Sequence, residues 1–461
     1  MAVKGEAGAQ TQAGGMQADP HIVVLGAGPA GGAVALGLRR LGYRVTVAGQ
    51  ARPFAAVEGV SERVLAGLRQ AGFEQALAQV PEPSPREVTW SGQTSGANTE
   101  RLLRRVELDR AIGIELQAQG VTLLDGRVRS SRTCGNGYRV EVQGEQGGDV
   151  QVLQADFLVE ARGRAAPGAG LERLRGPETV SLLQAWQGPE RAPMSAVQSF
   201  GDGWAWMAAT EGGLRYLQLT LDVASANLPP KEQLTEYCVT RLSSLARAAP
   251  FMAGASPVGT PHARTSTPIL CREPVGDNWI RVGDAAMAVD PLSGNGIFQS
   301  LSSALQAPAV INTLLRHPQR RAQARAFHQA RVEHLFYRFA RIGRDFYAME
   351  QHSAGNSFWQ ARRAWPDSVE VHQSVTPGQV SIERRAVLNG DLIDEAEVVV
   401  TPDQPLGIWH LNGVALAPLL RAWREAPDAS AGQAALARAL GERGAQAPQL
   451  LQWMRQSGWV S

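Results

Sequence analysis

The sequence predicts an α/β protein in three parts: a parallel-sheet domain, an antiparallel-sheet domain inserted into it, and a small C-terminal α+β module. Three observations predict this fold. A strand, a glycine-rich turn and a helix open the chain, alternating strands flank a glycine turn in the middle, and new strands and helices follow Pro366. The 461 residues also exceed what one hydrophobic core usually organises. We expect a disordered tail over 1–20, the first domain over 21–165 and 260–365, the second over 166–259, and the module over 370–461.

The first elements form a βαβ unit. The apolar run 21–25 predicts a strand, 31–41 a helix, and 44–48 a second strand after Gly42. Apolar residues then recur at helical spacing over 58–71 and again over 105–119. The run 121–124 is typical of the next parallel strand.

The middle of the chain has a different pattern. Alternation over 138–142, 204–208 and 216–221 predicts strands, and the Glu211-Gly212-Gly213 turn joins the last two as an antiparallel hairpin. A helix is expected over 231–248. The run 279–282 then returns to the strand type seen at the start, so the first domain resumes there.

The last third is mostly helical up to about residue 363. Leu335, Phe339, Ile342 and Phe346 form a stripe at helical spacing, which favours core packing over a binding face. In the C-terminal module we expect strands at 380–388 and 396–400 and a helix at 414–424. Ser430 and Gln433 predict a capping box for the next helix, and Pro448 and Gly458 bracket the last one.

Composition excludes several function classes. Lys+Arg number 45 and Asp+Glu 43, so the net charge of +2 is too small for a general nucleic-acid field. Cys134, Cys238 and Cys271 lie far apart without any CxxC spacing, which argues against a disulfide framework and against a metal site. No stretch of about 18 apolar residues occurs. We therefore expect a cytoplasmic protein with no nucleic-acid or membrane partner.

A glycine-rich turn between the first strand and the first helix carries the first chemical motif. It consists of Gly26, Ala27, Gly28, Pro29, Ala30 and Gly31. In such a turn the first glycine permits the tight bend, the second lets the backbone approach a pyrophosphate, and the third lets the helix pack closely. The helix N-terminus then faces the phosphate charge. An acidic residue is expected after the second strand to bind the ribose, but Gln50 stands there, and its amide is our candidate for that role.

A second motif follows the strand at 279–282. Gly283 ends this strand, and Asp284 stands where it could hold a ribityl hydroxyl. A Pro/Gly loop then feeds a helix whose N–H groups could face the pyrimidine edge of a flavin and stabilise the negative charge of its reduced ring. The candidate residues of this loop are Pro291, Gly294, Asn295, Gly296 and Ile297.

Together these motifs resemble the p-hydroxybenzoate hydroxylase superfamily of flavoproteins over roughly residues 21–365. Two further segments support the resemblance: 105–109 is similar to the family's R-x-x-[FL]-D helix start, and 158–164 to its D-A-T-G-R segment. The resemblance implies a Rossmann-like FAD-binding domain interrupted by an antiparallel-sheet substrate domain. It also implies that Arg105 approaches the FAD phosphates, and that NADH or NADPH is the reductant without a second nucleotide fingerprint.

The segment 158–164 is more like that of flavin-dependent halogenases and prenyl reductases. Trp204 and Trp206 also match the first half of the halogenase W-x-W-x-I-P motif, although the Ile-Pro half is missing. Two tryptophans at this spacing share one strand face, and packing is as good an explanation as substrate contact. Halogenases relay hypohalous acid through a lysine, whereas this chain has only Lys4 and Lys231, neither suitably positioned. We therefore rank a monooxygenase above a halogenase.

The whole chain, including 358–367 and the C-terminal module, is similar to flavoproteins that mature protein-derived quinone cofactors. The resemblance implies hydroxylation of a tryptophan within a polypeptide, on the way to cysteine tryptophylquinone. The alternatives are a halogenase or prenyl-type reductase acting on a small molecule, and a binding protein that only holds FAD and a polypeptide. His262 and His334 are candidate bases by residue type alone, so no catalytic residue is assigned.

Overall fold

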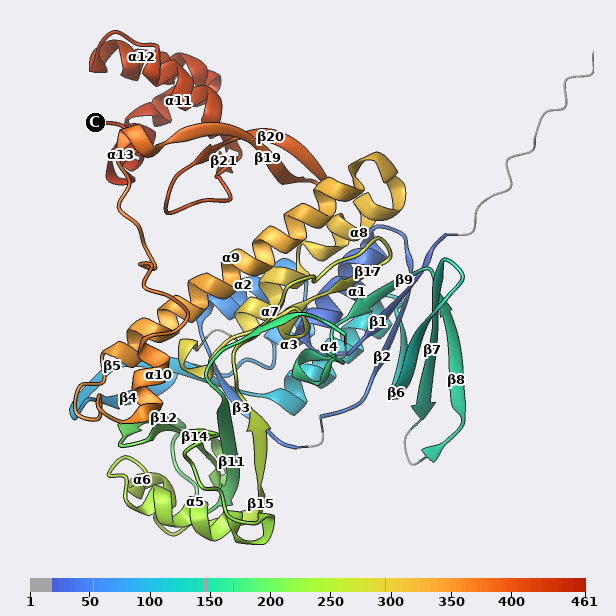
Figure 1. Cartoon of the computed structure of the whole chain (residues 1–461), viewed down its shortest axis with the longest axis vertical. Coiled ribbons are helices and arrows are strands. Elements are labelled where there is room, and N and C mark those ends of the chain that lie inside the picture. Colours follow the sequence, from blue (N-terminus) through green and yellow to red (C-terminus); the bar gives the residue numbers. More distant parts are fainter. Residues whose placement is uncertain (1–18, 53, 145–146, 169, 295) are drawn as a thin grey trace, which may run out of the picture.

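The structure is a computed structural model that describes residues 19–52, 54–144, 147–168, 170–294 and 296–461. The tail expected over 1–20 lies almost wholly outside these residues. Figure 1 shows two large sheets held together by a long helix, with the C-terminal module at one end. The predicted α/β fold is confirmed.

The first sheet has seven strands in the order β17-β9-β1-β2-β6-β7-β8. Their bounds are β1 (His21–Leu25), β2 (Arg44–Gly49), β6 (Thr122–Cys134), β7 (Gly137–Gly144), β8 (Val150–Ala155), β9 (Phe157–Glu160) and β17 (Trp279–Arg281). The five strands from β17 to β6 pair in parallel, and β7 and β8 extend the sheet in antiparallel fashion. Since β9 lies beside β1 and β17 lies beside β9, although both come much later in the chain, the first domain is assembled from distant segments.

Helices cover this sheet and close its core. They are α1 (Pro29–Arg40), α2 (Glu62–Ala71), α3 (Glu74–Leu77), α4 (Arg105–Ala118), α7 (Gly296–Ala304), α8 (Ala307–Arg316) and α9 (Arg321–Ala348). Fully buried Ile22, Val34, Ile112 and Ile280 belong to one hydrophobic cluster with α7 and α8. This parallel sheet reads as continuous apolar runs because its central strands are buried.

The second sheet has eight strands in the order β15-β11-β14-β13-β12-β4-β5-β3. Their bounds are β3 (Val57–Val60), β4 (Ser84–Trp90), β5 (Gln93–Arg104), β11 (Thr179–Gln187), β12 (Met194–Phe200), β13 (Gly203–Ala209), β14 (Leu214–Asp222) and β15 (Ser256–Thr265). Helices α5 (Leu234–Ser243) and α6 (Ala249–Met252) pack on one face. The hairpin predicted at 204–221 is confirmed as β13 and β14. Three of the strands, β3 to β5, come from the range 57–104, before the second domain's expected start.

The second sheet is strongly curled. Val57 of β3 and Leu102 of β5 share a buried cluster with Leu183 of β11 and Tyr216 of β14, although several strands separate them in the sheet. One end of the sheet therefore folds over the face opposite α5. This concave face is the hollow that turns toward the first domain.

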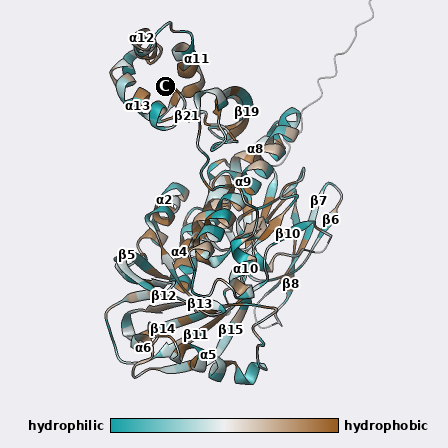
Figure 2. Ribbon diagram, turned by 60° about the vertical axis from the view of Figure 1, so that its left-hand side comes forward, coloured by the Kyte–Doolittle hydropathy of each residue, from teal (hydrophilic) through white to brown (hydrophobic). Residues whose placement is uncertain are grey.

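A small third sheet and the last helices complete the molecule. Strands β10 (Arg173–Arg175), β16 (Ile269–Cys271) and β18 (Met287–Ala288) form the third sheet, and α10 (Ser357–Arg363) follows α9. The C-terminal module comprises β19 (Ser381–Asn389), β20 (Leu392–Val400), β21 (His410–Leu411), β22 (Val414–Ala415), α11 (Leu416–Arg424), α12 (Ala429–Ala439) and α13 (Ala447–Gln456). Its helices form a hydrophobic core of their own at one end of the molecule (Figure 2), while the β19–β20 hairpin packs against α8 and α9.

Two predicted helices begin or end elsewhere. The helix expected over 58–71 starts only at Glu62, because Val57–Val60 pairs as strand β3 with β5 and Ser61 is the N-cap. The helix expected over 231–248 is a 3-10 turn at Lys231–Gln233 followed by α5, which ends at Ser243. Helical periodicity does not reveal a strand whose partner lies forty residues away.

Two predictions of detail were also wrong. The cap of α12 is Asp428, whose carboxylate accepts a hydrogen bond from the Ala431 amide at 2.8 Å, so Ser430 already lies inside the helix. A carboxylate at this position also interacts favourably with the helix dipole. In the α9 stripe, Phe339 is buried but Phe346 is 43% exposed, because the last turn of α9 packs through the neighbouring Tyr347, which is buried in the cluster with α10.

Candidate active site

The glycine turn between β1 and α1 has the geometry that a dinucleotide requires. Gly26 has φ +112°, and a Cβ there would lie 2.5 Å from the Ala161 carbonyl oxygen. A Cβ on Gly31 would lie 1.9 Å from the Gly26 oxygen. Gly28, by contrast, has an ordinary extended backbone and only open space within 4 Å of a Cβ. The fold therefore does not require glycine here, and the open space could admit an approaching ligand.

The second motif meets the first directly. Gly283 and Asp284 lie in the 3-10 turn η5 (Gly283–Ala285), and a Cβ on Gly283 would lie 2.8 Å from the Cβ of Ala30 in α1. Helix α7 holds this turn, since the Gly283 amide donates to Ser303 Oγ at 2.8 Å and Ser300 Oγ donates to Asp284 at 3.3 Å. The tertiary structure thus brings Asp284 beside the start of α1.

The loop between Asp284 and α7 is held in place by Arg164, which belongs to the segment 158–164 that resembles the family. Arg164 donates to the carbonyls of Thr267 at 2.5 Å and Val289 at 2.7 Å, and its Nε lies 3.6 Å from Asp284. Pro291 begins the 3-10 turn η6 (Pro291–Ser293), and Gly294 has φ +63°. Gly296 begins α7 and Ile297 is buried, whereas Asn295 lies outside the described residues.

Charged side chains from four segments gather around these motifs. Arg105 of α4 donates to Glu58 of β3 at 2.5 Å and to Asp109 at 2.9 Å. Burial alone would raise the pKa of Glu58, but Arg105 and other arginines lower it below its usual value. Burial raises the pKa of Asp284, although Arg164 opposes this, and 32% of its side chain stays accessible. Asp284 is thus surrounded by protein atoms and still accessible, and the region around Gly28, Arg105 and Asp284 is called the cleft below.

The same cleft contains unused hydrogen-bond donors. Arg105 Nε is buried and has no hydrogen-bond partner among the described residues, and Arg52 Nε lies 3.8 Å from its nearest carboxylate, Asp109. Burial lowers the pKa of Arg52 and of Arg264, so both guanidinium groups are partly desolvated. Unsatisfied donors beside an open glycine and a helix N-terminus fit the pyrophosphate of a dinucleotide.

The hollow of the second sheet faces this cleft. Cross-strand pairing sets Trp206, Gln218, Leu183 and His262 in one row on the concave face. Trp206 Nε1 donates to Glu100 of β5 at 3.3 Å across the curl, and Arg264 donates to Gln218 at 2.8 Å. A Cβ on Gly59 would lie 2.0 Å from the Glu100 carboxylate, so Gly59 leaves it room. The hollow therefore offers aromatic faces and a few fixed polar groups.

Trp204 is part of the framework. Its Nε1 donates to the Tyr347 hydroxyl at 3.1 Å, and Tyr347 donates to Asp290 at 2.8 Å. These bonds link the second sheet to α9 and to the loop before α7. Burial raises the pKa of both Tyr347 and Asp290, so Tyr347 stays a donor. The packing explanation for Trp204 therefore holds, whereas half-buried Trp206 faces the hollow.

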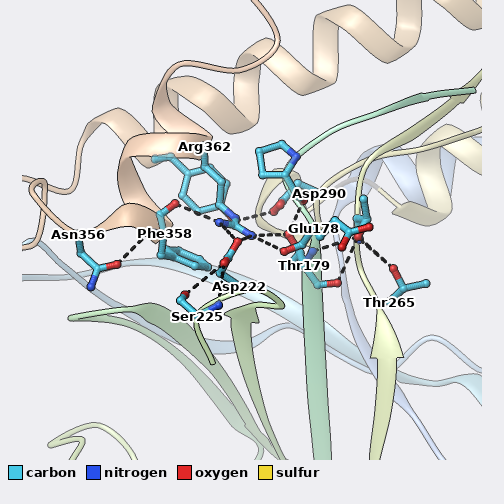
Figure 3. A network of polar contacts seen from close by, with 12 residues as sticks. Glu178, Thr179, Asp222, Ser225, Thr265, Asp290, Asn356, Phe358 and Arg362 are labelled. Carbon is cyan, nitrogen blue, oxygen red and sulfur yellow. Dashed lines mark hydrogen bonds and ion pairs between the residues drawn. The ribbon is translucent and has the colours of Figure 1, made fainter. Parts of the chain in front are cut away.

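Arg362 of α10 joins the same region. It donates to Thr179 Oγ1 at 2.7 Å, to the Glu178 carbonyl at 3.0 Å and to Asp222 at 3.2 Å, and it lies 4.0 Å over the Phe358 ring. Figure 3 shows this guanidinium at the centre of the network, with Asp290 close by. Helix α10 is thereby locked onto the ends of β11 and β14.

No family model matches the chain. The solved structure of the peptidyl tryptophan dihydroxylase QhpG, essential for tryptophylquinone cofactor biogenesis, is 54% identical, with a TM-score of 0.83, and the match covers 96% of this chain and all of that one. The chain belongs to the QhpG family.

More distant relatives are flavin-dependent enzymes. The tryptophan 2-halogenase of Chondromyces crocatus is 25% identical over 387 residues, covering 74% of this chain and 70% of that protein. The flavin-dependent halogenase CmlS, at 16% identity with a TM-score of 0.74, covers 96% of this chain and 95% of its own, which shows a shared fold alone. The QhpG family is thus one branch of the flavin-dependent oxidoreductases that the motifs indicated.

The structure brings most of the predicted site residues together. Gly26 to Gly31, Gly283 and Asp284 adjoin, whereas Gln50 follows β2, is exposed and makes no hydrogen bond within the described residues. His334 lies on α9, and burial lowers its pKa; His262 stacks on Phe54 at 4.8 Å. Sequence reasoning missed Glu58, Glu100, Arg264 and the serines of α7. Arg164 was not named as a site residue either, but the sequence did give a signal for it, since it lies in the segment 158–164 that resembles the family.

Two further properties concern the described part of the chain. None of its helices is long and apolar enough to cross a membrane. No three His, Cys, Asp or Glu side chains are grouped there so that they could hold a metal ion.

Proposed function

We propose that this chain is an FAD-dependent monooxygenase that dihydroxylates a tryptophan within a polypeptide, during maturation of a protein-derived quinone cofactor. The observation that carries the proposal is the 54% identity to QhpG over 96% of the chain, which includes the C-terminal module. The matched region spans nearly the whole chain, so the cleft, the hollow and the appended module all lie within it. The substrate polypeptide would be its partner.

The residues of the cleft would hold FAD. The start of α1 at Gly28 would take the pyrophosphate, Arg105 and Arg52 would supply donors to it, and Asp284 would bind the ribityl hydroxyls. Pro291, Gly294 and the start of α7 would border the ring, and Gln50 the ribose. When bound, FAD supplies the electron transfer from NADH or NADPH to O2 that each hydroxylation requires.

The hollow would orient the substrate ring. Trp206 and Leu183 would provide flat apolar contact, and Glu100, which is 9% exposed, would accept a hydrogen bond from the indole N–H of the substrate. Glu58 is already paired with Arg105 and serves the cofactor side. The buried Trp204, Tyr347 and Asp290 chain would keep water from the far side of the hollow.

A halogenase is less well supported. Halogenases need an active-site lysine, but Lys231, the only lysine among the described residues, lies in the 3-10 turn directly before α5, the helix packed on the face opposite the hollow. A prenyl-type reductase would need a long apolar channel, whereas the hollow contains Gln218, Arg264 and Glu100. A protein that merely binds FAD would not consume NADH.

The test is the intact mass of tryptophan-containing candidate polypeptides after incubation with the protein, FAD, NADH, O2 and bromide. A gain of roughly 16 or 32 mass units, the mass of one or two oxygen atoms, is expected. Protein stripped of FAD is the blank, and Glu100→Gln should bind FAD normally but hydroxylate at least about tenfold more slowly. A brominated product would favour the halogenase, and NADH oxidation without product would point to a small aromatic substrate.

A further inference from the structure

A second cavity lies away from the cleft, where the C-terminal module meets α8 and α9. Its volume is about 400 Å³. Apolar side chains from three segments form its walls: Phe327 and Ala330 of α9, Val387 and Leu388 of β19, and Leu406 and Ile408 of the loop before β21. Because all three contribute, anything bound here would bridge the module and the flavin domain.

One cation in this cavity has no counterion. Arg331 lines the wall, and among the described residues it has neither a hydrogen bond nor an ion pair; its one polar contact is with the Phe327 ring, 5.8 Å from the guanidinium carbon. Its neighbour in the cavity, Arg385, is paired with Glu383 at 2.6 Å. Burial lowers the pKa of Arg331, and no carboxylate offsets that effect.

Arg331 is partly buried among apolar groups, and its contact with the Phe327 ring compensates only part of the cost of desolvating its charge. Arginine binds carboxylates through two parallel N–H donors, and such a ligand would remove the penalty. The cavity volume also falls within the range of about 300–1,000 Å³ that is usual for small-molecule sites.

We propose that this cavity binds a small amphipathic carboxylate, with its acid group on Arg331 and its apolar body against Phe327, Val387 and Leu406. Bound there, the ligand tethers β19 and the loop before β21 to α9. The proposal does not depend on the reaction catalysed in the cleft.

The test is calorimetric titration of the FAD-loaded protein with decanoate below its micelle concentration, with decanol and decyltrimethylammonium as chain-matched probes. Decanoate should bind at least about tenfold more tightly than either, since a charged hydrogen bond contributes about 1.5–3 kcal/mol. Arg331→Gln should weaken the binding of decanoate about tenfold. Arg338→Gln, which removes a charge from the same helix outside the cavity, should leave it unchanged.

A second variant guards against misfolding of the first. Ala330→Trp fills the cavity but keeps Arg331, and should also abolish decanoate binding while FAD binding is retained. The proposal is overturned if decanoate does not bind, if decanol binds equally well, or if Arg331→Gln binds like the unmodified protein. Binding of an acidic apolar peptide in place of decanoate would overturn it as well, and would assign the cavity to a polypeptide.

Discussion

Gly28 and Gly31 are three residues apart and identical in type, yet the structure requires them for different reasons. Gly28 has φ −75° and ψ −176°, a conformation open to any residue, and a Cβ there meets nothing. Gly31 has no space for a Cβ, because the Gly26 carbonyl is in the way. Gly31 is therefore required by the chain fold, whereas Gly28 is free for the role proposed above, contact with the cofactor.

Substituting alanine at each position separates these roles. Gly28→Ala should leave the melting temperature of the FAD-free protein unchanged but weaken FAD at least about tenfold, because the added methyl group occupies the pyrophosphate's approach. Gly31→Ala should unfold or strongly destabilise the FAD-free protein. Thermal unfolding without FAD and a flavin fluorescence titration measure the two effects. Full FAD affinity in Gly28→Ala would contradict the assignment of the turn.

His328 provides a second test at the scale of a residue. It is buried on α9, its Nε2 donates to the Arg281 carbonyl at 2.9 Å, and burial lowers its pKa to about 4. Between pH 6.5 and about 4 the unfolded chain binds a proton that the folded protein does not, so stability falls as the pH falls. The loss should approach about 3 kcal/mol below pH 4. In His328→Gln the free energy of unfolding, measured with denaturant, should lose this part of its pH dependence. A pH profile like that of the unmodified protein would refute the role assigned to His328.

At the scale of elements, two buried side chains, Arg362 and Trp359, hold α10 in place. Arg362 is 2% exposed and contacts Thr179, Glu178 and Asp222 from strands β11 and β14 and their flanks. Buried Trp359 adds indole hydrogen bonds to the carbonyls of Phe200 and Gly201. A short helix far along the chain thereby closes one side of the hollow.

Arg362→Ala should lower the free energy of unfolding by about 3–5 kcal/mol, because it leaves the Asp222 carboxylate buried without its partner. Asp222→Asn with Arg362→Met, which removes both charges, should lose less than Arg362→Ala alone. Urea denaturation of the single and double variants gives the comparison. Equal losses would show that the ion pair itself contributes little.

At the scale of the whole molecule, the reactivity of the three cysteine thiols measures how readily the hydrophobic cores open. Cys238 lies on the buried face of α5, and Cys271 lies in the small third sheet; burial raises the pKa of Cys238 to about 12 and also raises that of Cys271. Cys134 is exposed on β6. The parts that hold Cys238 and Cys271 must open before either thiol can react.

A disulfide reagent should therefore label one thiol per chain rapidly under native conditions and all three in denaturant. Cys134→Ser should abolish the rapid phase and leave the slow phase unchanged. The absorbance of the released thiolate measures both rates. Rapid labelling of two or more thiols in the native protein would mean that one of these cores opens easily.

Local patterns in the sequence were sufficient to predict the glycine turn, α1, the β13–β14 hairpin and strand β17 before the second motif. Each is a contiguous segment whose periodicity or turn chemistry is local. Strand β3 was wrongly predicted as helix, because its conformation depends on pairing with β5, and α2, α3 and β4 lie between the two in the sequence. The cap of α12 was misassigned for a smaller reason: two good capping residues, Asp428 and Ser430, lie close together, and backbone geometry selects one.

The sequence by itself determined the dinucleotide-type turn, the second flavin motif and, through resemblance, the family, since these depend on residue types at short spacing. Only the tertiary structure decided that β3, β4 and β5 belong to the second sheet, that this sheet curls so that Glu100 reaches Trp206, and that Arg331 stands unpaired in a cavity. The physical reason is that curl, burial and charge pairing arise between segments distant in the chain. No local pattern of residues records which of these segments will meet.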